Sequence, residues 1–320
     1  MRYSIFLQLI LLTTISACTV NPVSETDNIE QTAAATDKLQ QGKNLATISS
    51  RQTLRIMSFN IRWQGKDKDG VYHDSGFAHR KPLVLDVLTK FGADIIGLQE
   101  ASIEQRAELA PELPGFGMFP LSTGAGDECI LYRLGRFDLR GSGHEALRQE
   151  PEKAATNIGV RDFVWVYLHD RISGKRFYVL NLHLDHRSSE RGRQLDGVLI
   201  GEWIRKRKFA DPVILTGDFN GNPDQPRYLY LTGQREYAGE NGATVSIPVK
   251  MLDTFTVANP HAMYTGTGNS GYRGDKNRNQ IDYVFVSSGS KVIGSSILYY
   301  HADGSYPSDH FPVLSEIELE

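Results

Sequence analysis

Several apolar segments of this 320-residue chain begin or end with a side chain that can bind a metal ion or transfer a proton. The stretches concerned read SFNIRW, GLQE, NLHLDH, GDFN, QIDYVFVS and SDHFPV. Their chemically competent residues are Asn60, Glu100, His183, Asp218, Asn220, Asp282, Asp309 and His310. A charged group buried with a strand needs a partner or a metal ion. Strand ends that converge on one edge would provide such partners, so the pattern predicts a single polar site.

Each residue also has a simpler interpretation. Asn60 could satisfy the backbone of a turn, and Glu100 could favour the start of a following helix. Asp218 could form an Asx-turn in GDFN, and His183 could be a hydrogen-bonded core histidine. The set as a whole favours a site, because every one of these segments carries a group suited to metal or phosphate chemistry.

The donor types indicate which chemistry to expect. Carboxylate and amide oxygens suit a hard cation such as Mg²⁺, with Mn²⁺ as a substitute. The cysteines are not clustered, which argues against structural zinc. A histidine paired with a carboxylate forms an acid/base unit. Whether Asp218 or His310 takes the proton of an attacking water is left open by the sequence.

The elements that would position these residues mix strands and helices without regular alternation. Apolar residues at helical spacing predict helices over residues 79–92 and 188–207. Short apolar runs predict strands within residues 54–61, 93–100, 163–184, 211–220, 280–287, 295–300 and 311–320. This order predicts an α/β fold of four layers, α/β/β/α, in which two mixed sheets pack face to face with helices outside.

The N-terminus predicts export. Residues 1–18, MRYSIFLQLILLTTISAC, combine a basic Arg2, a short apolar run and small residues before Cys18. The ending ISAC resembles a bacterial lipobox, so Cys18 is predicted to be lipidated; a plain secretory signal is the alternative. Thr19 after the cysteine favours the outer membrane, facing the periplasm or the exterior. Residues 19–50 are polar and predict a flexible tether, and residues 51–320 predict one catalytic domain with Cys129 as a buried inert thiol.

From Thr53 to the C-terminus, the ordered set of motifs resembles the endonuclease/exonuclease/phosphatase superfamily, with its deoxyribonuclease I-like fold. NLHLDH and YPSDHFPV are most similar to exported bacterial lipoproteins of that superfamily. The resemblance implies that Glu100 is the main Mg²⁺ ligand, with Asn60 close by and Asp309 as a further metal contact.

The resemblance also implies the catalytic roles. Asp282 would fix the tautomer of His310, and His310 would activate or orient the attacking water. Asp218 and Asn220 would position that water and the phosphoryl group, and His183 would donate to a non-bridging oxygen. Arg161 and His186 are predicted to contact the substrate. Residues 264–280 are rich in Gly and Asn and predict a mobile, solvated loop near the site.

Charge narrows the choice of substrate. The net charge is −3 and the pI is about 6.3, whereas proteins that grip long nucleic acid usually carry a basic excess. We therefore expect a magnesium-dependent phosphohydrolase for a small organic phosphate, such as a sugar phosphate or nucleotide. A secreted nuclease acting on DNA or RNA is the alternative, and a non-catalytic surface binding protein is the second. The domain is expected to be monomeric and to contact the membrane only through its N-terminal lipid.

Overall fold

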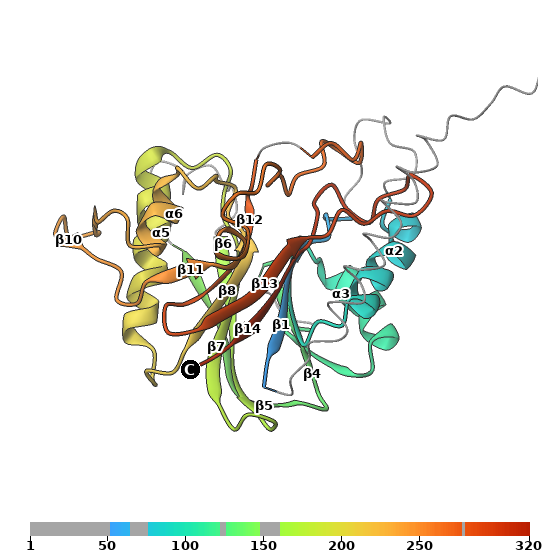
Figure 1. Ribbon diagram of the computed structural model, residues 1–320, viewed down its shortest axis with the longest axis horizontal. Helices are drawn as coiled ribbons and strands as arrows, with labels where there is room; N and C mark the ends of the chain where they lie inside the picture. Colours follow the sequence, from blue (N-terminus) through green and yellow to red (C-terminus); the bar gives the residue numbers. More distant parts are fainter. Residues whose placement is uncertain (1–51, 65–75, 122–125, 148–160, 277–278) are drawn as a thin grey trace, which may run out of the picture. The chain divides into compact units, whose positions relative to one another are not determined.

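The computed structural model describes residues 52–64, 76–121, 126–147, 161–276 and 279–320, without the side chain of Arg161. The predicted signal peptide with Cys18 and the predicted tether lie outside these ranges. Within them, two six-stranded sheets dominate (Figure 1). The first sheet contains, in spatial order, β13 (Lys291–Ile297), β14 (Val313–Glu318), β1 (Leu54–Asn60), β2 (Ile95–Gln99), β4 (Cys129–Arg133) and β3 (Phe116–Phe119).

The second sheet contains, in spatial order, β11 (Met251–Asp253), β12 (Asp282–Ser287), β8 (Val213–Asp218), β7 (Arg176–His183), β6 (Arg161–Asp170) and β5 (Phe137–Leu147). Strands β9 (Tyr237–Ala238) and β10 (Thr244–Val245) form a separate short ribbon. The pairs β1–β2 and β7–β8 are parallel, and the other pairs in the two large sheets are antiparallel. The predicted pair of mixed sheets is therefore confirmed.

Helices cover the outer faces of both sheets. Figure 1 shows α2 (Phe77–Lys90) and α3 (Ile103–Leu109) on one side, and α5 (Glu190–Lys206) and α6 (Pro226–Leu231) on the other. A short helix, α7 (Thr254–Ala258), follows β11, and a 3₁₀ turn, η1 (Ala110–Glu112), follows α3. Among the described residues, no helix combines the length and the apolar character needed to cross a membrane.

Alternation along the strands divides the apolar residues into three clusters. In β1, Ile56 belongs to the cluster between the sheets, while Met57 belongs to the cluster beneath α2 and α3. In β8, Ile214 faces the space between the sheets, and Leu215 joins the cluster beneath α5 and α6. Successive strand side chains point to opposite faces, so each sheet buries both faces and the predicted four layers are confirmed.

One predicted strand is shifted. Residues 295–300 were expected to be extended, but β13 spans Lys291–Ile297 and the chain then leaves the sheet. Tyr300 packs edge-on against Phe91 and donates a hydrogen bond from its hydroxyl to Asp86, 2.7 Å away. Contact with α2 therefore overrides the strand preference of Tyr300.

The space between the sheets changes from apolar to polar along the strands. Beyond the apolar cluster lies a layer of neutral polar side chains, all fully buried: Ser58, Gln99, Asn181 and Thr216. Gln99 Nε2 donates to Asn181 Oδ1 at 2.6 Å, and Thr216 Oγ1 donates to the same oxygen at 2.9 Å. Asn181 Nδ2 donates to the carbonyl of Leu98 at 2.7 Å and so ties the second sheet to the first. These hydrogen bonds fix how the two sheets face each other, although the side-chain oxygen of Gln99 has no hydrogen-bond partner within the described residues.

Gly97 gives a direct test of this layer. A methyl group at Gly97 would overlap the side-chain oxygens of Thr216 and Asn181. We expect Gly97→Ala to lower the free energy of unfolding by about 1–3 kcal/mol, because overpacking displaces the polar layer. Urea unfolding followed by circular dichroism measures the change. Gly115→Ala is the control, since a methyl group there meets no atom within 4 Å. A Gly97→Ala protein as stable as the wild type would contradict the close fit.

Candidate active site

The strand ends that carry the predicted residues lie at the upper end of the sheets in Figure 1. In the second sheet, Asp282 pairs in register with Asp218, and Asp218 pairs with His183 on the next strand. Each of the three follows the same alternation as the inward-facing apolar residues of its strand. They therefore form a row across three neighbouring strands, directed into the space between the sheets.

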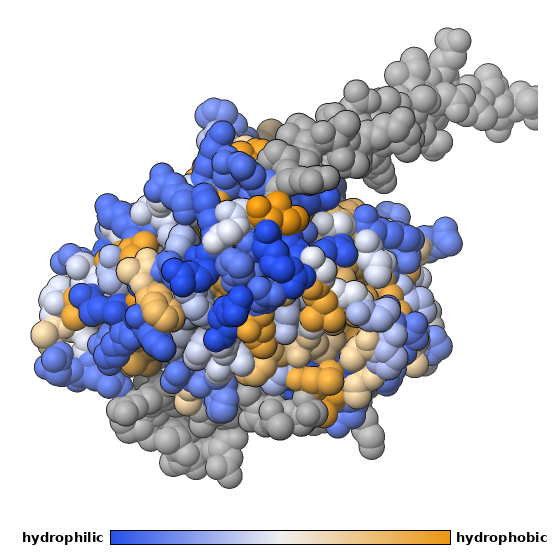
Figure 2. Space-filling view, turned by 90° about the horizontal axis from the view of Figure 1, so that it is seen from below, coloured by the Kyte–Doolittle hydropathy of each residue, from blue (hydrophilic) through white to orange (hydrophobic). Residues whose placement is uncertain are grey.

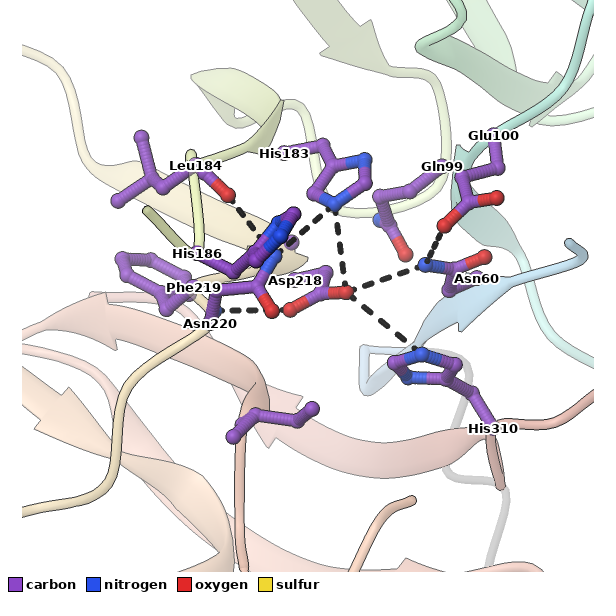
Figure 3. A network of polar contacts seen from close by, with 12 residues as sticks. Asn60, Gln99, Glu100, His183, Leu184, His186, Asp218, Phe219, Asn220 and His310 are labelled. Atoms are coloured by element: carbon purple, nitrogen blue, oxygen red, sulfur yellow. Dashed lines mark hydrogen bonds and ion pairs between the residues drawn. The ribbon is translucent and has the colours of Figure 1, made fainter. Parts of the chain in front are cut away.

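Asp218 lies at the centre of the polar network (Figure 3). Its Oδ2 accepts a hydrogen bond from Asn60 Nδ2 at 3.1 Å, and lies 3.5 Å from His183 Nε2 and 3.8 Å from His310 Nε2. Its Oδ1 accepts the backbone N–H of Asn220 at 2.8 Å. Burial and the nearby Asp282 carboxylate raise the pKa of Asp218. This carboxylate is thus surrounded by two imidazoles and two donors from both sheets.

His310 is held by Asp282. The His310 Nδ1 lies 2.8 Å from Asp282 Oδ2, and Asp282 is fully buried. Burial alone lowers the pKa of His310, but the Asp282 carboxylate outweighs it and raises the pKa well above its usual value. The backbone N–H of His310 also donates to Ser308 Oγ at 3.2 Å. The imidazole is therefore fixed with Nε2 directed toward Asp218, as Figure 3 shows.

Glu100 stands on the opposite sheet, one residue after β2. Its backbone is left-handed, with φ of 55°, a conformation uncommon for residues other than glycine. Its carboxylate accepts hydrogen bonds from Trp63 N at 2.9 Å and from Asn60 Nδ2 at 3.1 Å. Burial opposes ionisation, but the field of His183 and the Trp63 hydrogen bond lower the pKa of Glu100 to about 2. Glu100 is therefore a carboxylate over the whole physiological pH range.

Two asparagines connect these groups. Asn60 Nδ2 donates to both Glu100 and Asp218, while its Oδ1 accepts the N–H of Arg62 at 2.9 Å. Asn60 thus joins the carboxylates of the two sheets through its amide nitrogen. Asn220, also left-handed with φ of 44°, directs Nδ2 to His183 Nε2 at 3.0 Å and to the Leu184 carbonyl at 2.8 Å.

The structure supplies a test of whether the predicted metal ligands can hold a cation. Arg62 Nη1 lies 3.7 Å from Glu100 Oε2 and 3.7 Å from Asp309 Oδ2. A positive group thus already lies within 3.7 Å of an oxygen of each carboxylate, so both carboxylates attract a cation to this place. The donors are carboxylate oxygens, which Mg²⁺ prefers. Glu100 and Asp309 therefore fit the predicted ion.

A second group of possible ligand atoms lies nearby. Atoms of Asp218, Asp282 and His310 approach one another within 4.8 Å. Within this group, however, His310 Nδ1 and Asp282 Oδ2 are already engaged with each other at 2.8 Å. Glu100 and Asp218 line the cavity described next, whereas neither Asp282 nor Asp309 does. The geometry therefore favours an acid/base unit for His310 and Asp282, and an ion on the Glu100 side.

These groups line a cavity of about 520 Å³ between the sheet ends. Its walls include Glu100, His183, Asp218, Asn220 and His310 from the predicted set. The predicted substrate contact His186 also lines the cavity, with its side chain 62% exposed. The other predicted contact, Arg161, begins β6, but its side chain lies outside the described part of the chain. Carboxylates that the sequence analysis missed complete the wall: Asp127, Glu128 and Asp162.

The predicted loop over residues 264–280 is only partly solvated. Thr267 and Asn269 are fully buried. Asn269 donates from its backbone N–H to the Asp309 carbonyl at 2.9 Å and from Nδ2 to the Ser308 carbonyl at 2.6 Å. These bonds connect the segment to the chain that carries His310, so it lies near the site as predicted, but Thr267 and Asn269 are buried where a solvated loop was expected.

A buried arginine, which sequence reasoning also missed, supports two site segments at once. Arg80 in α2 donates to the carbonyls of Ile61 at 2.6 Å, Arg62 at 3.0 Å and Pro307 at 2.8 Å. These carbonyls lie just after Asn60 and just before Asp309. The signal available in the sequence was a basic residue inside an otherwise apolar helix face, which a surface interpretation explains equally well.

We expect Arg80→Lys to impair positioning. The ammonium group of lysine cannot reproduce the planar guanidinium group, whose nitrogens reach three carbonyls. The buried carbonyl oxygens would therefore lose hydrogen-bond donors. The free energy of unfolding should fall by about 2–3 kcal/mol and kcat by about 10- to 100-fold, with a smaller change in KM. Urea unfolding and steady-state kinetics measure both. Arg140→Lys, at an exposed position of β5, should leave both unchanged; equal effects of the two variants would refute the role of Arg80.

Known proteins are similar to this chain in sequence and in fold. A model of the Endonuclease/Exonuclease/phosphatase family matches residues 57–310 of the chain. The chain has no match among curated proteins. A solved endonuclease/exonuclease/phosphatase family protein from Bacteroides thetaiotaomicron is 25% identical, with a TM-score of 0.69; the match covers 84% of this chain and 95% of that chain.

Two further solved structures show the same fold at lower identity. A mannosyl-6-phosphatase from Bacteroides thetaiotaomicron is 24% identical with a TM-score of 0.67, and the match covers 82% of this chain and 99% of that chain. The catalytic domain of human Nocturnin is 20% identical with a TM-score of 0.63, covering 84% of this chain and 94% of that chain.

Proposed function

The chain belongs to the endonuclease/exonuclease/phosphatase family, whose members hydrolyse phosphate esters, and on this premise we propose that it is a magnesium-dependent phosphohydrolase for a small organic phosphate. The observation that carries the proposal is the composition of the cavity. Metal-type and acid/base residues line it together with three further carboxylates, Asp127, Glu128 and Asp162, and two guanidinium groups, Arg62 and Arg187. A cavity of this size, in which carboxylates outnumber arginines, suits one phosphate group with a neutral organic part better than a long polyanion.

Glu100 and Asp309 would hold the ion, because both carboxylates already attract the Arg62 guanidinium group. When bound, Mg²⁺ would neutralise charge on the phosphoryl oxygens. Mn²⁺, which shares the preference for oxygen ligands, would substitute. Asn60 would hold the Glu100 and Asp218 carboxylates in register through its amide nitrogen.

The attacking water would lie between Asp218 and His310. Their facing atoms, Oδ2 and Nε2, are 3.8 Å apart, too far for a good direct hydrogen bond and within reach of a shared water. Asp282 keeps His310 oriented through Nδ1. His183 lies on the other side of Asp218 and accepts at Nε2 from Asn220 Nδ2, which would leave Nδ1–H as its donor to a phosphoryl oxygen. The two imidazoles thus flank the position that the phosphate would occupy.

We further propose that the protein is exported and anchored to the outer membrane only through lipid on Cys18, with a monomeric catalytic domain. Figure 2 shows the end of the molecule opposite to the site. On the part of that end not covered by grey atoms, hydrophilic residues predominate, and several hydrophobic residues adjoin one another toward the lower right. The lipobox-like ending ISAC at residues 15–18 is the feature that supports attachment by lipid.

A substrate panel with the purified full chain tests the proposal. It should contain hexose phosphates, nucleoside monophosphates, a phosphodiester reporter, plasmid DNA and RNA, each with Mg²⁺ and with EDTA. We expect release of inorganic phosphate from a monoester, lost in EDTA, and intact DNA and RNA. Cleavage of DNA or RNA with no monoester turnover would instead establish the nuclease alternative. A folded protein that binds but does not hydrolyse any phosphate compound would support a non-catalytic binding protein.

A further inference from the structure

Asp162 extends the row of site residues by one strand. In the second sheet, Phe163 of β6 pairs with Leu182 of β7, so Asp162 lies beside His183 on the neighbouring strand. Val164, Val166 and Leu168 of β6 belong to the cluster between the sheets. By alternation, Asp162 points to the same face, and it lines the catalytic cavity. The row across the sheet is therefore Asp282, Asp218, His183 and Asp162.

The position of Asp162 does not suit phosphate binding. Strands are spaced about 4.8 Å apart, which places Asp162 two strands, or about 10 Å, from Asp218. A phosphate held between His183 and His310 would not reach that far, and a carboxylate would repel it. Whatever part of the substrate faces Asp162 must therefore be uncharged or positive, and connected to the phosphate.

The hydrogen bonding of Asp162 is incomplete. Its Oδ1 is buried and accepts no hydrogen bond within the described part of the chain. Burial raises the pKa of Asp162, and the field of His144 only partly offsets this. A buried carboxylate oxygen without a donor is costly. Because Asp162 lines the cavity, a ligand hydroxyl there would be placed to donate to its carboxylate group.

We propose that Asp162 is a specificity-determining residue that accepts a hydrogen bond from a hydroxyl group of the substrate, so that the site selects polyol phosphates such as sugar phosphates. The selection of a hydroxyl-bearing organic part rests on the proposed phosphohydrolase function. Asp127 and Glu128 line the same cavity and add further carboxylates to it. A carboxylate that accepts a hydrogen bond from a substrate hydroxyl group favours substrates that have this hydroxyl and disfavours analogues that lack it.

The test compares two monoesters, a hexose 6-phosphate and n-hexyl phosphate, which differ in hydroxyl groups. The wild type, Asp162→Asn and Asp162→Ala are measured as full chains. We expect both substitutions to lower kcat/KM for the hexose phosphate by about 10- to 100-fold and to change that for hexyl phosphate by less than about threefold. Asp138→Asn is the control. Asp138 lies in β5, next to β6, but at the opposite end along the strands from Asp162, and it forms ion pairs with Arg140 and Arg171.

Binding provides a second readout that needs no turnover. Calorimetric titration of each phosphate into protein kept in EDTA should show the same selective weakening for Asp162→Asn. Loss of selectivity in binding, without hydrolysis of either ester by the wild type, would uphold the role of Asp162 and refute the phosphohydrolase. Hydrolysis and binding of both esters with an unchanged ratio in the variants would refute the role of Asp162 alone. Absence of binding of either ester in EDTA, together with absence of hydrolysis of either ester in Mg²⁺, would overturn both proposals.

Discussion

Replacing His310 with alanine is expected to lower kcat by about 10²- to 10⁴-fold, the usual contribution of a positioned acid/base group. The physical reason is the geometry of Nε2, which faces Asp218 across 3.8 Å while Nδ1 is held by Asp282 at 2.8 Å. Without the imidazole, the water loses one of its two partners. Steady-state kinetics with a monoester and saturating Mg²⁺ measure the loss.

The pairing with Asp282 makes this prediction more specific. Asp282→Asn keeps the shape of the side chain but removes the charge that fixes the imidazole, so kcat should fall by at least about tenfold. In the double variant, the two losses should be far from additive, because both residues act as one unit. His301→Ala, at an exposed position, should keep full activity. Additive losses, or a His310→Ala enzyme with wild-type kcat, would show that this pair does not take part in the reaction.

Replacing Glu100 with glutamine is expected to weaken Mg²⁺ binding by at least about 100-fold, since ligand neighbours alone often contribute 10- to 100-fold. Glu100 has a pKa of about 2, so the wild type presents a full negative charge at neutral pH. Glutamine keeps the size and one oxygen but removes that charge. Activity should therefore require a much higher Mg²⁺ concentration, and calorimetric titration of Mg²⁺ should show the loss without any substrate.

The neighbouring Glu104 offers a matched control. It lies in the first turn of α3, four residues further along the chain, and is exposed. Glu104→Gln should leave Mg²⁺ affinity and activity within about twofold of the wild type. Urea unfolding of both variants separates metal binding from folding. If Glu100→Gln bound Mg²⁺ as tightly as the wild type, the ion would have to lie elsewhere, and the group Asp218, Asp282 and His310 would be the next candidate.

Much of the fold could be predicted from the sequence, because buried positions are occupied by apolar residues at the spacing of a helix or a strand. The run from Val213 to Asp218 is apolar and ends in a carboxylate, and the strand is found there. The helix predicted over residues 188–207 is α5, Glu190–Lys206. Prediction failed at Tyr299 and Tyr300, which have strand-forming side chains but lie beyond the end of β13. Tyr300 contacts Asp86 in α2, 214 residues away, and Tyr299 packs against Phe311, so no local pattern carries that information.

The sequence by itself determined which chemical groups lie at the strand ends, because a polar residue that ends an apolar run can be recognised in the linear sequence. The tertiary structure alone decided how those groups meet. It set Arg62 beside Glu100 and Asp309, placed Arg80 beneath two loops, and put Asp162 in line with His183. The physical reason is that alternation fixes which face a side chain occupies, whereas the order and register of strands fix its neighbours. That order depends on hydrogen bonds between segments far apart in the chain.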